Sequence, residues 1–212
     1  MKTPMELRND KLGAQVVKAL QSRFFEAWYF EDIPPAVEKV FSLIPKTDTV
    51  SWGGSFTTTA LGLTEKAVER GYKVIDRDKA SSPEERVERM RQALLCDTFL
   101  TGTNAITEDG QLVNIDGAGN RVAAMTFGPK QVIVVAGINK VRKTLDAAVD
   151  RARTIAAPAN AQRFLPKTPC SETGACGDCH TEESICTFFV RTRLCKPKGR
   201  IKVILIGKDL GL

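Results

Sequence analysis

The sequence contains a single histidine, His180, among its 212 residues. General acid–base chemistry elsewhere in the chain would therefore depend on carboxylates. The chain also lacks an apolar signal segment near Met1, and no run approaches the roughly 20 apolar residues that cross a bilayer. We therefore expect a cytoplasmic protein with no membrane partner.

The composition shows no strong bias of charge or hydrophobicity. Hydrophobic residues make up 42% and charged residues 26%, which is typical of a globular chain and argues against general disorder. Lys and Arg outnumber Asp and Glu by 31 to 25, and the resulting net charge of +6 favours anionic partners but is too small to indicate nucleic acid. Six cysteines without an export signal indicate metal or redox use instead of structural disulfides.

The apolar pattern predicts a helical start followed by alternating strands and helices. Apolar residues at four-residue steps predict a long helix over residues 9–31, and a second helix follows Pro34-Pro35 and ends at Pro45. The expected strands after these helices are residues 49–52, 73–76, 98–103, 111–115 and 131–136. The expected helices between them pass through Leu61 and Val68, from Ser82 to Cys96, and through Leu145 and Ile155. The second of these begins at Ser82 as its N-cap and carries Val87, Met90 and Leu94 on one apolar face. The turn signal Glu108-Asp109-Gly110 is expected to join strands 98–103 and 111–115.

Strand and helix alternation of this kind predicts an α/β fold with a mainly parallel sheet flanked by helices. We expect a single domain over residues 1–212, with N-terminal helices in residues 1–46 and the α/β body in residues 47–160. Residues 156–160 are the expected boundary, and residues 161–212 hold a cysteine loop and a terminal hairpin formed by residues 188–194 and 201–206.

Four cysteines lie close together between residues 170 and 186, a segment that we call the cysteine loop. Cys170, Cys176, Cys179 and Cys186 follow the spacing C-x5-C-x2-C-x6-C. Four soft thiolates suit either tetrahedral zinc or an iron–sulfur cluster. Structural zinc more often uses two C-x2-C pairs, and only one is present, so the spacing favours a 4Fe-4S cluster over zinc.

Other interpretations of the cysteines stay open at this stage. Cys195 is an alternative ligand if the true set omits one of the four, and reduced thiols without a metal are a further alternative. The residues from Cys176 to His180 also match C-x-x-C-H, the haem-attachment spacing, although the expected compartment argues against haem. Cys96 is expected to be an ordinary buried thiol.

Two glycine-rich turns follow predicted strands. Residues 50–57 run from a strand through Gly53-Gly54 into a helix, and residues 116–121 repeat this arrangement. Glycines let backbone N–H groups approach a ligand, and such turns at strand ends are typical of anion-binding crevices, although a tight β–α connection explains the same spacing.

The sequence around these turns resembles the LUD domain of lactate-utilisation proteins. The resemblance rests on residues 101–110 (TGTNAITEDG), 113–117 (VNIDG), 120–122 (NRV), 128–129 (GP) and 134–137 (VVAG). It implies a sheet similar to the glucosamine-phosphate isomerase, ribose-phosphate isomerase and CoA-transferase group. It also implies a role in oxidising L-lactate to pyruvate beside an iron–sulfur or oxidoreductase partner subunit, although the ferredoxin-like C-x2-C-x2-C motifs of a larger LUD protein are absent here.

The resemblance further implies a ligand crevice for a small anionic organic substrate. The residues expected to line it are Gly53, Gly54, Ser55, Asn104, Asp116, Gly117, Asn120 and Arg121.

Three functional hypotheses follow. The first is an iron–sulfur protein of organic-acid oxidation. The second is an isomerase- or transferase-like enzyme acting on a phosphorylated or acyl substrate with a structural zinc, where Asp116 and then Glu108 are the candidate catalytic carboxylates unless Asp116 merely braces its turn. The third is an interaction module that docks an acidic partner through the basic residues of the C-terminal segment.

Overall fold

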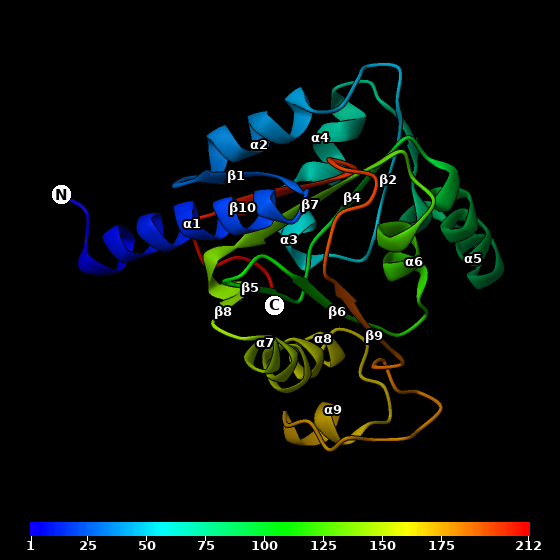
Figure 1. The fold of residues 1–212 in the computed structure, drawn as a ribbon. Coiled ribbons are helices and arrows are strands. Elements are labelled where there is room, and N and C mark those ends of the chain that lie inside the picture. Colours follow the sequence, from blue (N-terminus) through cyan, green and yellow to red (C-terminus); the bar gives the residue numbers. More distant parts are fainter.

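Two β-sheets organise the chain, which the computed structural model describes over residues 1–212 (Figure 1). The larger sheet has six strands in the order β1-β10-β7-β4-β2-β3, and every neighbouring pair is parallel. Its strands are β1 (Glu26–Phe30), β2 (Thr49–Trp52), β3 (Lys73–Ile75), β4 (Thr98–Thr101), β7 (Gln131–Gly137) and β10 (Ile201–Ile206). The predicted α/β class with a mainly parallel sheet is confirmed.

Helices cover both faces of the large sheet. Val132 and Val134 of β7 pack into a core shared with α1 (Pro4–Ser22) and α6 (Asn120–Thr126). Ile133 and Val135 point to the opposite face, into a core shared with α2 (Ile33–Ser42) and α4 (Leu63–Glu69). Burial on both faces explains why central parallel strands appear in the sequence as continuous apolar runs. The remaining helices are α3 (Phe56–Ala60), α5 (Pro83–Gln92), α7 (Leu145–Arg151), α8 (Ala157–Ala161) and α9 (Pro169–Thr173).

The smaller sheet forms a further layer between the first core and α7 (Figure 1). Its order is β8-β5-β6-β9, where β6 is antiparallel to both β5 and β9, and β8 is parallel to β5. Its strands are β5 (Ala105–Thr107), β6 (Leu112–Asp116), β8 (Val141–Arg142) and β9 (Phe188–Thr192). Leu112 faces the large sheet's core, whereas Val113 and Ile115 pack against Ala148 of α7.

The prediction of one helix over residues 9–31 is wrong in its second half. The helix α1 begins earlier, at a capping box between Thr3 and Glu6, and ends at Ser22. Phe24 then adopts a left-handed backbone with φ of 69°, and the aromatic segment that follows becomes the edge strand β1 beside β10. Tertiary pairing of a β-prone run therefore overrides the helical spacing.

The predicted terminal hairpin is also wrong. β9 joins the smaller sheet beside β6, whereas β10 lies in the large sheet between β1 and β7. The run Ile201–Ile206 is apolar on both faces, which suits a central parallel strand better than a two-stranded ribbon. The turn at Glu108-Asp109-Gly110 joins β5 to β6, not β4 to β6, and residues 156–160 continue the helical segment instead of ending it.

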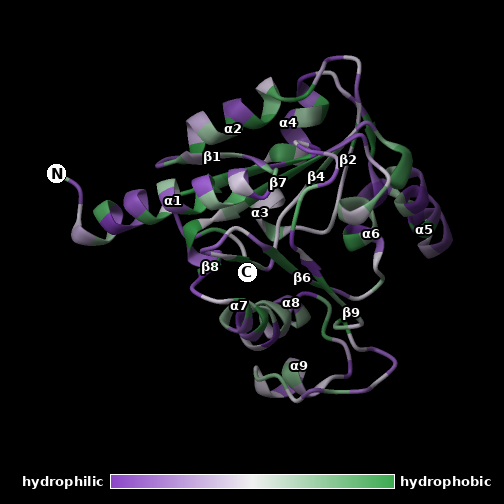
Figure 2. Cartoon of the chain, viewed as in Figure 1, coloured by the Kyte–Doolittle hydropathy of each residue, from purple (hydrophilic) through white to green (hydrophobic).

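The start of α5 agrees with the sequence pattern, but its predicted apolar face does not form. Ser82 accepts a hydrogen bond from the backbone of Glu85, as expected for the N-cap, yet no residue of α5 is buried. Figure 2 shows α5 as mostly hydrophilic, in contrast to the strands of the large sheet. None of the helices, α5 included, combines the length and apolar character needed to cross a membrane.

Candidate functional site

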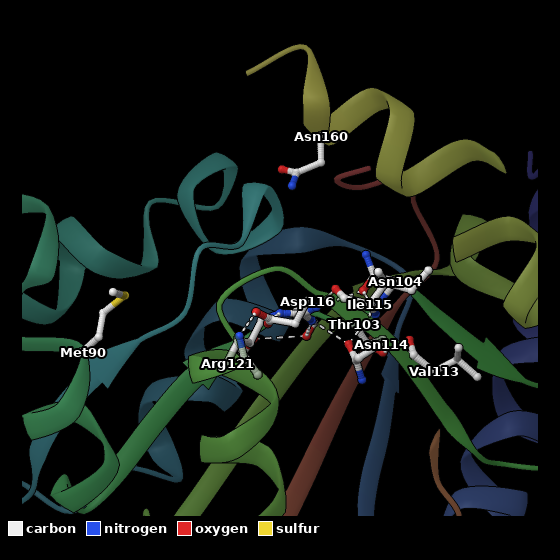
Figure 3. Close-up of polar contacts among 12 residues, drawn as sticks. Met90, Thr103, Asn104, Val113, Asn114, Ile115, Asp116, Arg121 and Asn160 are labelled. Carbon is white, nitrogen blue, oxygen red and sulfur yellow. Dashed lines mark hydrogen bonds and ion pairs between the residues drawn. The ribbon is translucent and has the colours of Figure 1, made fainter. Parts of the chain in front are cut away.

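The loops that follow β2, β4 and β7 open onto a cavity of about 310 Å³, which we call the crevice. The carboxyl ends of parallel strands meet at one edge of a sheet, so short loops there bring distant parts of the sequence together. The loop after β6 forms another wall, and Asn160 of α8 lies across the opening (Figure 3). The crevice is thus enclosed by both sheets and by the helical segment before the cysteine loop.

Most of the residues expected from the sequence do line the crevice. They are Gly54, Ser55, Asn104, Asp116, Gly117, Asn120 and Arg121. Gly53 lies just behind the lining, where a Cβ atom would come within 3.0 Å of Arg121 Cγ. Glu108 is not brought to the crevice, because it sits in the β5–β6 turn and forms an ion pair of 2.8 Å with Lys143. Glu108 therefore lies outside the crevice and cannot act on a ligand bound there.

Arg121 forms the polar centre of the wall between the two sheets (Figure 3). Its side chain is buried, and each of its N–H groups has an acceptor. The acceptors are Asp116 Oδ2 at 3.0 Å, Asn114 Oδ1 at 2.6 Å, Asn104 Oδ1 at 2.9 Å, and the carbonyl oxygens of Ile115 at 2.6 Å and Gly102 at 3.4 Å. Arg121 is therefore fixed by protein groups and supplies charge to the crevice without a free donor for a ligand.

Asp116 is fully engaged by its own turn. One carboxylate oxygen pairs with Arg121, and the other accepts a hydrogen bond of 2.9 Å from the backbone N–H of Gly119. Both carboxylate oxygens therefore already have protein partners. The geometry fits the interpretation of Asp116 as a residue that braces the turn and anchors Arg121, instead of a general base.

Lys140 is a buried cation at the floor of the crevice that the sequence analysis did not identify. It follows β7 at the end of a short 3₁₀ turn, only 4% of it is exposed, and its Nζ donates to Thr57 Oγ1 at 3.1 Å. Lys140 makes no ion pair with a carboxylate. Burial lowers the pKa of Lys140 to about 7, and the positive charges of Arg151 and Arg121 add to this effect.

Three further arginines, Arg77, Arg86 and Arg163, lie in the outer lining. The Arg77 guanidinium packs against Gly54, and its buried Nε has no hydrogen-bond acceptor. Burial also lowers the pKa of Arg77. With Arg121 and Lys140, the lining contains five basic side chains and one acidic side chain, that of Asp116. The crevice therefore carries an excess of positive charge.

The cysteine loop adjoins the crevice. Ile185, next to Cys186, lines the crevice, and its Cα lies 3.3 Å from the position of a Cβ atom on Gly117. An ion pair of 2.5 Å between Arg153 and Asp178 ties the loop to the helical segment after α7. The loop is thus held against one wall of the crevice.

The four predicted ligands share this loop but differ in burial. Cys170 is buried in α9, Cys179 and Cys186 are half-buried, and Cys176 is exposed. Burial, followed by the nearby charges of Cys176, Cys170 and Cys179, raises the pKa of the Cys186 thiol to about 11. No three metal-binding side chains in the structure lie close enough together to hold one ion.

Cys195 and Cys96 lie elsewhere, in the core beside α1. Cys195 Sγ accepts from the backbone N–H of Ile201 at 3.2 Å, which gives this thiol a role in the strand connection. Burial raises the pKa of Cys96 to about 12, as expected for an inert core thiol.

Two lining residues that were not predicted could have been found from the sequence. Arg77 and Lys140 each follow a predicted strand within a few residues, and strand ends are where ligands bind in open α/β sheets. Arg163 had no such signal, because its place depends on the helical path of residues 152–161, and the sequence pattern predicts a boundary within that segment.

The family model of the LUD domain matches residues 13–206 of this chain. Among solved structures, a DUF162 family protein from Deinococcus radiodurans is similar over 94% of this chain and 98% of that one, with a TM-score of 0.55 and 15% identity, which shows a shared fold. Ribose 5 phosphate isomerase A from Neisseria gonorrhoeae matches over 52% of each chain with a TM-score of 0.34 and 15% identity. A search among curated proteins finds no match.

Proposed function

As the chain belongs to the LUD-domain family, we propose that it binds a small organic anion in the crevice and takes part in the oxidation of lactate or a related organic acid. The observation that carries this proposal is the charge of the crevice, whose lining has five basic side chains and one acidic side chain, Asp116, which pairs with Arg121. Outside the lining, Asp78 pairs with Arg77 and Arg86, so the basic side chains still outnumber the acidic ones. A cationic cavity with few competing carboxylates favours a ligand that brings its own negative charge.

The outer arginines are the groups that would hold the ligand's carboxylate. Arg77 Nε has no hydrogen-bond acceptor and lies 3.7 Å from Asp78 Oδ1, and arginine's planar fork matches a carboxylate in a bidentate arrangement. Arg163 lies 6.0 Å from the Phe56 ring, so a cation and an apolar surface stand side by side at the opening. Arg121 would keep the wall of the crevice rigid and positive, since all of its donors are already used.

We further propose that the cysteine loop carries a 4Fe-4S cluster held by Cys170, Cys176, Cys179 and Cys186. The chemistry of the donor set fits, because four cysteine thiolates are the ligands that such a cluster takes and all four lie in one loop. A cluster would supply one-electron transfer when bound, and Ile185, next in sequence to Cys186, lines the crevice. Such a site would pass electrons to an iron–sulfur or oxidoreductase partner subunit.

The test of the cluster is anaerobic purification followed by iron, sulfide and zinc analysis and visible absorption. We expect about four iron and four sulfide per chain, and we expect Cys176→Ser to lose the absorption. Cys195→Ala is the matched control and should keep it, since Cys195 lies in the main core. Stoichiometric zinc without iron would replace the cluster with structural zinc, and metal-free protein with four alkylatable loop thiols would contradict both.

A second candidate function is isomerase- or transferase-like chemistry on a phosphorylated or acyl substrate, with zinc in the loop. The observation in its favour is the same basic crevice together with Lys140, whose pKa burial lowers to about 7. Competition separates the two candidates. If ribose 5-phosphate displaces bound pyruvate with the lower dissociation constant of the two, the phosphorylated substrate class is favoured. If lactate and pyruvate compete with each other and ribose 5-phosphate displaces neither, organic-acid oxidation is favoured.

A further inference from the structure

Lys140 has an environment that differs from that of the ion-paired lysines. Lys2, Lys130 and Lys143 each lie within 2.8 Å of a carboxylate oxygen. Lys140 instead lies at the floor of the crevice with one hydrogen bond, to the Thr57 hydroxyl, and no carboxylate partner. Its amine is therefore held in a cavity large enough for a small molecule, without an anion that would keep it protonated.

The charged side chains that act on Lys140 favour the neutral amine. They are Arg121 of α6 and Arg151 of α7, and both are positive. The last residue, Leu212, also lines the crevice, and its backbone oxygen accepts a hydrogen bond of 3.3 Å from Arg151. Burial and the two arginines bring the pKa of Lys140 to about 7. Lysines that form imines with carbonyl substrates are activated in this way, by desolvation and by a neighbouring cation.

We propose that Lys140 is the nucleophile of a carbonyl-binding site, and that the crevice takes a small 2-oxo acid as an imine on Nζ. This inference rests on the proposed binding of an organic anion in the crevice. A 2-oxo acid combines the two features that the lining can recognise, a carboxylate for the outer arginines and an electrophilic carbon for the buried amine.

The step balances without an oxidant or reductant. The lone pair of Nζ attacks the carbonyl carbon and forms a C–N bond, and the carbonyl oxygen leaves as water with the two hydrogens of the neutral amine. Thr57, whose hydroxyl lies 3.1 Å from Nζ, orients the amine before attack. Because Lys140 is screened from solvent, its neutral form is present at a pH where surface lysines are protonated.

The test is reductive trapping. The full-length protein is incubated with pyruvate and sodium cyanoborohydride at pH 7, where the hydride adds to the imine carbon and gives a stable secondary amine. Intact-mass and peptide analysis should find one adduct per chain, located on Lys140. A surface lysine with a pKa of about 10.4 has roughly one neutral amine in a few thousand at this pH, so it should react far more slowly.

Lys140→Met and Lys143→Met form a matched pair, since Lys143 lies three residues away but is exposed and paired with Glu108. We expect Lys140→Met to abolish the adduct and Lys143→Met to leave it unchanged. As a measurement that needs no variant, the labelling rate of Lys140 in the wild-type protein should reach half its maximum near pH 7. An adduct scattered over surface lysines, or none at all, would overturn the inference.

Titration of the same sample with pyruvate, without the reductant, separates this inference from the proposed function. Saturable binding without an adduct leaves the anion-binding crevice in place and rejects the imine. Absence of both binding and adduct rejects the proposed function as well.

Discussion

Arg121 and Lys140 are both buried cations of the crevice, yet their surroundings give them opposite properties. Arg121 has an acceptor for every N–H group and an ion pair with Asp116, so it stabilises the junction of the two sheets. Lys140 has one hydrogen bond and two cationic neighbours, so its charge is disfavoured. A buried basic group with all of its donors paired, such as Arg121, has a structural role. A buried amine with few partners, such as Lys140, is available for chemistry.

Replacing Arg121 by Met should lower the free energy of unfolding by about 3–5 kcal/mol, because the substitution leaves a buried carboxylate without its partner. The measurement is urea denaturation at pH 7. Arg91→Met is the matched control, since Arg91 is 72% exposed and its pair with Glu88 spans 3.6 Å, and it should change stability by less than about 1 kcal/mol. Equal losses in the two variants would contradict the role of Arg121.

The low pKa of Lys140 predicts a pH-dependent stability difference. Between about pH 7 and the ordinary value of 10.5, the unfolded chain binds a proton at Lys140 that the folded chain has released, so folding becomes more favourable as pH rises. The stability of Lys140→Met relative to wild type should therefore be greatest below pH 7 and fall steadily toward pH 10.5. Urea denaturation of both proteins across this range checks the slope, and a difference independent of pH would show that Lys140 has an ordinary pKa.

At the scale of elements, the β5–β6 turn docks the smaller sheet onto α1. Gly110 has φ of 85°, and a Cβ atom there would lie 2.5 Å from the backbone carbon of Ala19. Arg23, just after α1, pairs with Asp109 of the same turn at 2.5 Å. Turn and helix thus fit together only because the turn carries a glycine at this position.

Gly110→Ala should therefore cost more than Gly71→Ala. Gly71 also has a positive φ of 76°, but a Cβ atom there meets nothing within 4 Å. We expect Gly71→Ala to cost about 1–2 kcal/mol from backbone strain alone, and Gly110→Ala to cost about 1–3 kcal/mol more because the helix must move. Denaturation midpoints measure both, and equal costs would mean that the turn does not press on α1.

Elements whose local pattern agrees with their tertiary place were predictable. β7 follows from its continuous apolar run, and the start of α5 follows from its Ser82 cap. β1 was missed because Trp28 continues the four-residue spacing of α1, and only the pairing with β10 shows that it belongs to a strand. The place of β10 was missed for a similar reason, since insertion between β1 and β7 joins segments that are far apart in sequence.

The site was predictable where it depends on turns and not where it depends on packing. Gly54, Ser55 and Asp116 were found because glycine-rich turns at strand ends mark a crevice. The lowered pKa of Lys140 could not be predicted, because it arises from burial and from cationic side chains on two other helices.

At the scale of the whole molecule, two sheets, the α7–α8 segment and the cysteine loop converge on one cavity. Ile185 places the loop beside the crevice, so a cluster and a bound organic acid would be neighbours. The proposed electron transfer and the proposed anion binding would therefore take place side by side, and both proposals depend on the crevice.

Calorimetric titration of the anaerobically prepared protein with pyruvate and with L-lactate tests this central claim most directly. We expect saturable binding at one site per chain, and we expect Arg77→Gln to weaken it by about 10- to 100-fold through loss of a charge-assisted contact. Arg91→Gln, which alters an exposed arginine outside the crevice, should bind like the wild type. Absence of binding, or equal affinity in Arg77→Gln and wild type, would contradict the account.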